Sequence, residues 1–463
     1  MAALSRVDLE GMVGAGEVDT VLCVMPDLWG RVVGKRVPAR NFLERILGPD
    51  GLHASLYLFV VDLDMNPLPG FELTDWERGF QDFRMVPDLS TLRLVPWLEG
   101  TALVICDAVH EKSGLPVEVS PRQILRRQVE RARAAGYTVK CGSELEVFLF
   151  RDSYEEAFGR SYRELRPLSH YRADYHILQT TKVEWLIRQI RNGMNDAGVP
   201  VEFSKGEWGL GQHEINLCYT DAMEMADRHA IYKNGLKEIA ALNGLSATFM
   251  AKWSAEEVGS SFHIHSSLWN EDGTESLMWD QADPRHMSQT FRHYLAGLMA
   301  TARELTLLKA PTMNAYRRYE RGSFAPTAIA WGDDNRTCGF RVVGEHEALR
   351  VEDRIPGADA NPYLAFAATI AGGLHGLEHK IEPPAVCTGN AYEAREAEQI
   401  PSSMAEAVAA FEGSSVAREA LGEEVFDHLL CLARAEKLAF EAAAVEGEGA
   451  AGEWELIRYF ERI

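Results

Sequence analysis

The segment TVKCGSELEVFLF, residues 138–150, constrains the fold of this chain more than any other stretch. It has the length and the side-chain alternation of a strand, and a period of two places Glu144 and Glu146 on one face. The same face continues with Phe148 and Phe150. One end of the face is therefore acidic and the other apolar, as in a strand that runs from a core into a polar site. Taken alone, the two glutamates fit a strand end that dips into water equally well.

Composition and charge narrow the class of protein. The chain has 463 residues, enough for two to four domains, and its 46% hydrophobic and 25% charged residues are ordinary for a globular protein. Its 47 basic and 69 acidic residues give a net charge of −22. This disfavours nucleic acid or an anionic membrane as the main partner, because binding phosphate groups requires basic patches.

The cysteines and the apolar segments indicate the cellular compartment in which the protein is expected. There are seven cysteines, an odd number, and no two form a CxxC pair. A disulfide framework or a thiolate zinc site is therefore not expected. Residues 1–16 lack the apolar core of a signal peptide, and no uninterrupted apolar run approaches the roughly 20 residues that span a bilayer. We expect a cytoplasmic protein.

The order of strand and helix signals predicts an α+β fold with a small first domain. Residues 18–38 read as two strands around a Pro-Asp-Leu-Trp-Gly turn, and residues 91–97 and 101–109 as further strands, with a helix near residues 41–47. A polar stretch containing Gly and Pro follows at residues 110–121. We therefore predict a β-rich domain over residues 1–110 and a larger α+β domain over residues 111–463.

Helix signals recur in the second domain. Ser120 can cap a helix whose first turn contains Pro121 and whose end is followed by Gly136. Further helices are expected over residues 221–243 and from Pro362 onward, and the last 60 residues read as mostly helical.

Two further motifs carry polar side chains that can bind a ligand or take part in catalysis. GEWGLGQHEIN supplies Glu207 and Glu214, separated by glycines that permit a tight backbone excursion. GSSFHIHSSLW places His263 and His265 on one strand face. Taken singly, the first motif is more typical of a solvated hairpin, and the histidine pair is more typical of packing.

Arginines and one more glutamate complete the set of candidates. Any single arginine is by default a surface ion pair. The sequence RVEDR places Glu352 and Arg354 on one face, with Arg350 just before them, and three more arginines lie in NAYRR and NRTCGFR: Arg318, Arg336 and Arg341.

If these motifs came together in space, their side chains would form one site with a single chemical function. Like charges about 4 Å apart repel by about 4 kcal/mol at an effective dielectric of 20, so clustered carboxylates persist only around cations. Carboxylate ligands select hard ions such as Mg²⁺ or Mn²⁺, and arginines suit phosphate oxygens and a substrate carboxylate. Together they are the equipment of phosphoryl transfer. Spacing along the chain does not show whether the strands meet.

The order of the motifs resembles one known family. SELEVFLF, GQHEIN, ATFMAKW, GSSFHIHSSL, NAYRR, NRTCGFR, RVEDR and ADANPY follow one another as in glutamine synthetases of the bacterial type I kind. The resemblance implies a β-grasp N-terminal domain and a catalytic domain built on a curved antiparallel sheet. It also implies active sites between neighbouring subunits of a homo-oligomer, usually a dodecamer of two hexameric rings.

The resemblance further implies a role for each matching residue. ATP would phosphorylate the γ-carboxylate of glutamate, and an amine would then displace phosphate. Two Mg²⁺ or Mn²⁺ ions would be held, one by Glu146, Glu207 and Glu214 and the other by Glu144, His263 and Glu352. ATP would contact His265, Ser267 and Arg350; the transferring phosphate Arg336 and Arg341; and glutamate Gly259, Arg318 and Arg354.

Departures from the family pattern concern the amine. Phe324 stands where ammonia-using members carry a flap glutamate, and Val258 replaces an asparagine that contacts glutamate. Asp27 is retained where an ammonium-binding aspartate is expected, and Tyr175 is a tentative match for the ammonium-site tyrosine. An aromatic wall suits an alkyl chain and can face a cation.

These departures resemble the γ-glutamylamine branch of the family. We expect a small acceptor such as ethanolamine, with a polyamine as a possibility. The alternatives are an ordinary glutamine synthetase that uses ammonium and, as a minor one, a non-catalytic relative.

Overall fold

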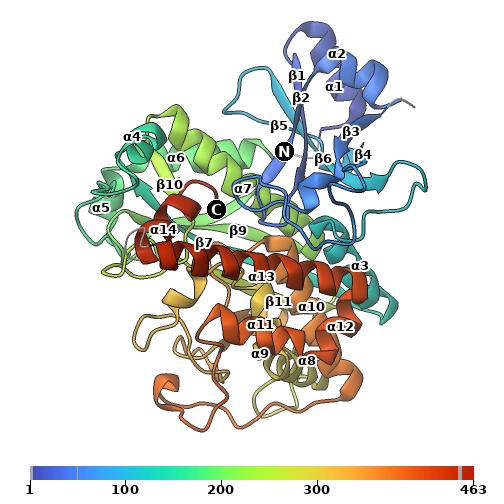
Figure 1. Cartoon of the computed structure of the whole chain (residues 1–463). Coiled ribbons are helices and arrows are strands. Elements are labelled where there is room, and N and C mark those ends of the chain that lie inside the picture. Colours follow the sequence, from blue (N-terminus) through green and yellow to red (C-terminus); the bar gives the residue numbers. More distant parts are fainter. Residues whose placement is uncertain (1–3, 49–50, 447–450) are drawn as a thin grey trace.

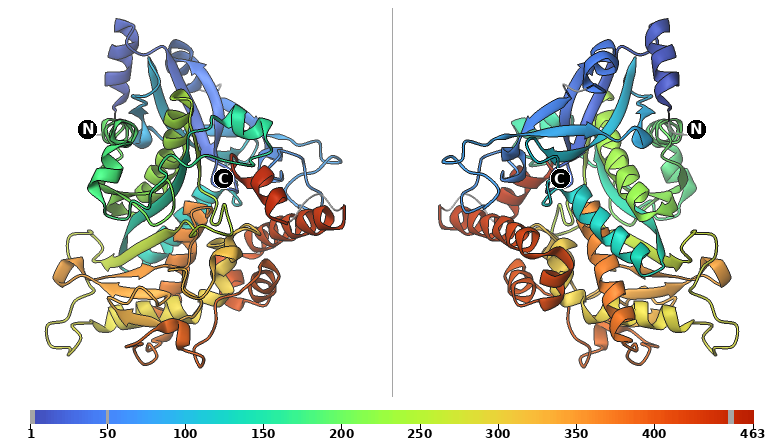
Figure 2. Two further views of the ribbon diagram at one scale, coloured as in Figure 1. Left: turned by 90° about the vertical axis from the view of Figure 1, so that its left-hand side faces the viewer. Right: turned by 90° about the vertical axis from the view of Figure 1, so that its right-hand side faces the viewer.

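The computed structural model describes residues 4–48, 51–446 and 451–463. Two sheets organise the chain, and the strands of the first stand above those of the second in Figure 1. The side views in Figure 2 keep this arrangement. A continuous set of buried apolar side chains runs through both parts.

The first sheet contains six strands, in the order β2-β1-β6-β4-β3, with β5 paired to β6. β1 runs parallel to β6, and the other pairs are antiparallel. The strands are β1 (Thr20–Pro26), β2 (Val32–Pro38), β3 (Leu52–Ser55), β4 (Asp82–Pro87), β5 (Arg93–Leu94) and β6 (Thr101–His110). The helices of this part are α1 (Arg6–Ala15) and α2 (Ala39–Asn41), the latter continued by a π-helical turn over Phe42–Ile46.

The second sheet positions the candidate site. Its order is β12-β13-β14-β11-β7-β9-β8, with β10 on β7, and all pairs except β12–β13 are antiparallel. The strands are β7 (Thr138–Phe150), β8 (Val201–Gly206), β9 (Gln212–Asp221), β10 (Ser246–Thr248), β11 (Phe262–Trp269), β12 (Trp331–Asp333), β13 (Phe340–Val343) and β14 (Arg350–Asp353).

Helices cover one face of the second sheet. α7 packs on β7 and β9, and α10 packs on α3, α7 and α8. α13, the long helix that crosses the front of Figure 1, contacts α11 and α12. The helices are α3 (Pro121–Ala134), α4 (Tyr154–Gly159), α5 (Ile177–Thr181), α6 (Glu184–Asp196), α7 (Ala222–Leu242), α8 (Gln289–Ala300), α9 (Ala302–Leu305), α10 (Pro362–His379), α11 (Met404–Glu412), α12 (Ser415–Leu421), α13 (Glu423–Glu446) and α14 (Ala451–Tyr459).

The sequence signals of α3 hold with one exception. Ser120 is the N-cap residue and Pro121 occupies the first turn, but the Ser120 side chain makes no capping hydrogen bond. The Ser120 carbonyl instead begins the helix by accepting from the Ile124 amide at 2.9 Å. The predicted cap is therefore right in position and wrong in its side-chain contact.

One arginine ties the two parts of the molecule together. Arg122 on α3 is 2% exposed and pairs with Asp88 and Asp107 of the first part and with Asp227 on α7, at 2.7–2.9 Å. The first sheet ends at His110, and we keep the domain boundary at residue 110 as a proposal. Among the described residues, no helix combines the length and apolar character that crossing a bilayer requires.

Candidate active site

The register of the second sheet brings the acidic motifs together. On β7, Glu144 lies opposite His263 of β11, and Glu146 lies opposite Glu214 of β9. Directly opposed side chains in an antiparallel pair lie close enough to share a ligand. The other face of β7 turns toward α7, where Ser143 hydrogen-bonds His229 at 2.9 Å. The alternation along β7 therefore separates a core face from a site face.

Six side chains form two groups that could each hold a metal ion. Glu352 on β14 joins the first group, and Glu207, in the loop before β9, joins the second. Within each group, the candidate ligand atoms lie within 4.8 Å of one another. The groups are Glu144, His263 and Glu352, and Glu146, Glu207 and Glu214.

In the second group, burial and mutual repulsion disfavour ionised carboxylates. Burial and the neighbouring carboxylates Glu144 and Glu207 raise the pKa of Glu214 to about 11. Burial and Glu207 raise the pKa of Glu146 to about 8, against stabilising contacts with Ser261 and Arg318. Ionised carboxylates repel here, so hard divalent ions fit this donor set.

The first group already contains compensating charge. Burial opposes ionisation of Glu352, but the neighbouring Arg354 guanidinium outweighs it, and the pKa of Glu352 is lowered to about 2. Burial and Arg354 lower the pKa of His263 to about 4, so its imidazole is neutral and able to bind a metal. The His263 Nδ1 atom lies 3.3 Å from Glu144, and its buried Nε2 has no hydrogen-bond partner among the described residues. One imidazole with two carboxylates fits Mg²⁺ or Mn²⁺.

A cavity of about 190 Å³ lies beside the two groups. Gly259 and the predicted glutamate-binding arginines Arg318 and Arg354 line it, and so does Arg336. A side chain at residue 259 could not be accommodated, because its Cβ would lie 2.7 Å from the Arg318 Cγ and 2.8 Å from the Ala251 carbonyl. The glycine therefore allows the loop to pass close to Arg318.

The arginines differ in how firmly they are held. Arg318 is buried, and its guanidinium donates to the carbonyls of Ile355 and Arg354 and to the Ser261 hydroxyl at 2.8–2.9 Å. Arg336 has a half-exposed side chain whose nearest carboxylate, Asp334, is 3.9 Å away. A fixed arginine suits recognition, and a free one can follow a group that moves.

Aromatic side chains line the same cavity. Phe324 and Trp208 have ring centroids 6.2 Å apart, and Tyr175 and Val258 line the wall as well. Phe324 and Tyr175 both have a φ of +64°, which non-glycine residues rarely adopt and which is typical of functional loops.

The sequence analysis named neither the charged residues Asp174 and Lys205 nor the aromatic residue Trp208, which also line this cavity. Lys205 and Trp208 flank Glu207, so their proximity to a predicted metal ligand was the available signal. The only sequence signal for Asp174 was its position next to Tyr175.

A second cavity, of about 480 Å³, gathers the predicted ATP contacts. His265, Ser267 and Arg350 line it, together with Arg341, which is predicted to contact the transferring phosphate. Glu144 of the first group lines both cavities, whereas Glu146, Glu207 and Glu214 of the second group line only the smaller one. Arg350 Nε donates to His265 Nδ1 at 3.0 Å, and His265 Nε2 lies 2.9 Å from Glu144.

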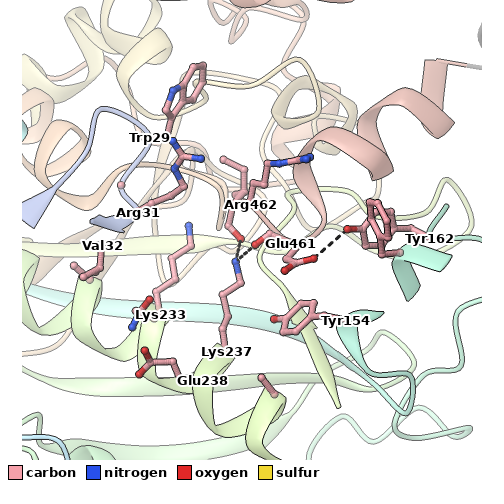
Figure 3. A pocket seen from close by; sticks show the side chains of 16 residues that line it. Trp29, Arg31, Val32, Tyr154, Tyr162, Lys233, Lys237, Glu238, Glu461 and Arg462 are labelled. Atoms are coloured by element: carbon pink, nitrogen blue, oxygen red, sulfur yellow. Dashed lines mark hydrogen bonds between the residues drawn. The ribbon is translucent and has the colours of Figure 1, made fainter. Parts of the chain in front are cut away.

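Asp27 lies outside the catalytic cavity of its own chain. Its carboxylate accepts hydrogen bonds from the Trp29 and Arg31 amides and pairs with the Arg31 side chain at 2.6 Å. The turn borders a different cavity, of about 540 Å³, toward which Lys233 and Lys237 project from α7 (Figure 3). No member of either metal group lines that cavity.

Comparisons with known proteins agree with this geometry. The family model of the glutamine synthetase catalytic domain matches residues 118–451. The chain belongs to the glutamine synthetase family. Members of this family are ATP-dependent ligases that use divalent metal ions, which the two groups of ligands fit.

Relatives define the branch of the glutamine synthetase family. Gamma-glutamylethanolamide synthetase GlnA4 of Streptomyces coelicolor is 48% identical over 98% of this chain and 96% of its own length. The glutamate–isopropylamine ligase of a Pseudomonas species is 38% identical over 96% of each chain. The solved GmaS complex with ADP has a TM-score of 0.81 and 28% identity, and covers 94% of this chain and 96% of its own.

These comparisons confirm the predicted family, its γ-glutamylamine branch, the α+β fold class and the assignment as an ATP-dependent glutamate–amine ligase.

Proposed function

We propose that this glutamine synthetase homologue joins glutamate to a small alkylamine, with ethanolamine as the first candidate. The observation that carries the proposal is the aromatic pair Phe324 and Trp208 on the wall of the catalytic cavity. Apolar contact with this wall favours an acceptor with methylenes, at about 0.8 kcal/mol for each CH₂ buried. The ethanolamide synthetase, 48% identical, supports the choice of acceptor.

The reaction would have two steps. The γ-carboxylate of glutamate first takes the terminal phosphoryl group of ATP, which gives γ-glutamyl phosphate and ADP. The amine nitrogen then attacks the γ-carbonyl carbon, the bond to the phosphate oxygen breaks, and the nitrogen loses its extra proton as the amide forms.

The residues of this chain would divide the work by position. Arg318 and Arg354, beside Gly259, would hold glutamate, and Arg336 and Arg341 would stabilise charge on the transferring phosphoryl group. Two Mg²⁺ or Mn²⁺ ions, held by the two ligand groups, would neutralise phosphate charge and the clustered carboxylates. His265, Ser267 and Arg350 would contact the nucleotide from the second cavity.

We also propose that active sites are shared between copies in a homo-oligomer, as in a dodecamer. Asp27 supports this, because its turn lies outside the cavity of its own chain and can act on an acceptor only in a neighbouring copy. Light scattering on the active enzyme tests the proposal, and a fully active monomer would refute it.

Acceptor specificity tests the proposed function. Phosphate release with ATP, Mg²⁺ and glutamate should give its highest kcat/KM with ethanolamine or another small monoamine, above putrescine, spermine and ammonium. A highest value for ammonium would show that the enzyme is an ordinary glutamine synthetase.

A further inference from the structure

One carboxylate in the catalytic cavity has no part in either metal group. Among the described residues that line the cavity, Asp174 alone carries a carboxylate outside those groups. Its side chain is about one-third exposed, so a ligand that enters the cavity can reach it. The other carboxylates of the lining are Glu144, Glu146, Glu207 and Glu214.

The backbone holds Asp174 against the loop of a metal ligand. The Asp174 amide donates to the Glu207 carbonyl at 3.1 Å, and the next amide, of Tyr175, donates to the Gly206 carbonyl at 3.4 Å. These two bonds connect the segment before α5 to the end of β8. Asp174 is therefore fixed on the same wall as Trp208 and Phe324.

An ammonium group already occupies the space beside Asp174. The Lys205 Nζ atom lies 2.5 Å from Glu207 Oε1 and 3.6 Å from Asp174 Oδ1. It also stands 4.1 Å from the ring centroid of Tyr175. Carboxylates and an aromatic face are the groups that recognise an alkylammonium ion. This corner of the cavity is thus built to hold a primary ammonium group.

The two carboxylates around that ammonium are not equally available. Glu207 belongs to a metal group, so its charge is committed when a divalent ion is bound. Among the described residues, the Asp174 carboxylate pairs only with Lys205, at the long distance of 3.6 Å. We propose that Asp174 binds the ammonium group of the amine acceptor and so helps to determine acceptor specificity. The acceptor's alkyl part would then lie along Trp208 and Phe324. This assignment rests on the proposed function.

Comparing a charged with an uncharged acceptor tests the assignment. Ethanolamine carries an ammonium group at neutral pH, whereas hydroxylamine is uncharged. In Asp174→Asn, the KM for ethanolamine should rise about tenfold, the equivalent of 1.4 kcal/mol of lost binding, and the KM for hydroxylamine by less than about twofold. Asp174→Glu should recover part of the loss. The control Asp196→Asn changes an exposed aspartate at the end of α6 and should alter neither KM.

Each other outcome has a definite meaning. An equal loss with both acceptors would make Asp174 a structural counter-ion of Lys205 and overturn the assignment, as would an unchanged KM for ethanolamine. If circular dichroism shows that Asp174→Asn does not fold, the double variant Asp174→Asn/Lys205→Met removes both charges, and the same ratio is measured there. If ammonium is the best wild-type acceptor, the proposed function fails, while a selective loss for ammonium over hydroxylamine in Asp174→Asn still supports the site.

Discussion

Trp208 and Phe324 both line the catalytic cavity and lie next to each other, with ring centroids 6.2 Å apart and ring planes tilted by 56°. They come from different segments, one beside the candidate metal ligand Glu207 and the other in the loop before β12. Their pairing gives the cavity an apolar surface next to its carboxylates.

Replacing Phe324 should shift the choice of acceptor. Phe324→Glu removes apolar contact worth about 0.8 kcal/mol per buried CH₂ and adds a carboxylate that favours a small cation. We expect kcat/KM for ethanolamine to fall about tenfold and that for ammonium to rise relative to it. Initial rates of phosphate release with both acceptors measure the ratio. Phe324→Leu is the control, and an unchanged ratio in Phe324→Glu would remove this residue from the acceptor site.

Metal binding should stabilise the protein through the two ligand groups. Mn²⁺ at about 100 times the Kd of a group should add about 2.7 kcal/mol to the free energy of unfolding for each group it occupies, and EDTA should reverse the gain. Glu214→Gln should lose most of the rise in Tm that comes from the second group, because it removes one of that group's three ligands. Glu146→Ala should also abolish phosphate release while remaining folded. Thermal unfolding with and without Mn²⁺ measures these effects, with Glu155→Gln on the exposed face of α4 as control. A full Tm gain in Glu214→Gln would refute the assignment.

The two classes of arginine should separate in steady-state kinetics. Contacts made mainly in the transition state lower kcat when removed, whereas uniform binding contacts raise KM. Arg336→Ala should therefore lower kcat about 100-fold, with little change in the KM for glutamate. Arg318→Lys keeps the charge but loses the planar fork, and should mainly raise the KM for glutamate. Arg40→Ala, on the exposed surface of the first part, is the control. The reverse pattern would exchange the proposed roles.

Stability should depend on pH through a histidine between the two parts. His428 on α13 is buried and hydrogen-bonds the Phe59 carbonyl at 2.7 Å, and burial lowers its pKa to about 4. The unfolded chain binds this proton near pH 6.5, so the stabilising effect is complete above pH 6.5 and is lost as the pH falls toward 4. The loss should reach about 3 kcal/mol.

Urea unfolding at several pH values measures this effect. His428→Gln should remove this contribution to the pH dependence between pH 6.5 and 4, whereas the contributions of His213 and His263, whose pKa values are also lowered to about 4, remain. His170→Gln, at an exposed position, should leave the dependence unchanged. An identical pH dependence in wild type and His428→Gln would contradict the assigned burial.

The local sequence determined much of this protein. The alternation of β7 sets Glu144 and Glu146 on one face and carries Phe148 and Phe150 to the Trp253 side of the core. Pro121 lies in the first turn of α3, and the helix expected over residues 221–243 corresponds to α7, Ala222–Leu242. These features follow from backbone periodicity and from residue preferences, which act over a few neighbours. The order of the motifs was also specific enough to identify the family.

Tertiary structure decided what the spacing could not. Glu144 meets His263 only because β7 and β11 pair in one register, across 119 residues of chain. A shift by one residue would have turned the ligands to the opposite face. The same long-range packing places Asp27 outside the catalytic cavity of its own chain and Asp174 beside Glu207 and Lys205. Contacts of this kind depend on how distant strands and loops pack together. Most of the site residues could therefore be predicted from the sequence, but the fold determines which of them are in contact.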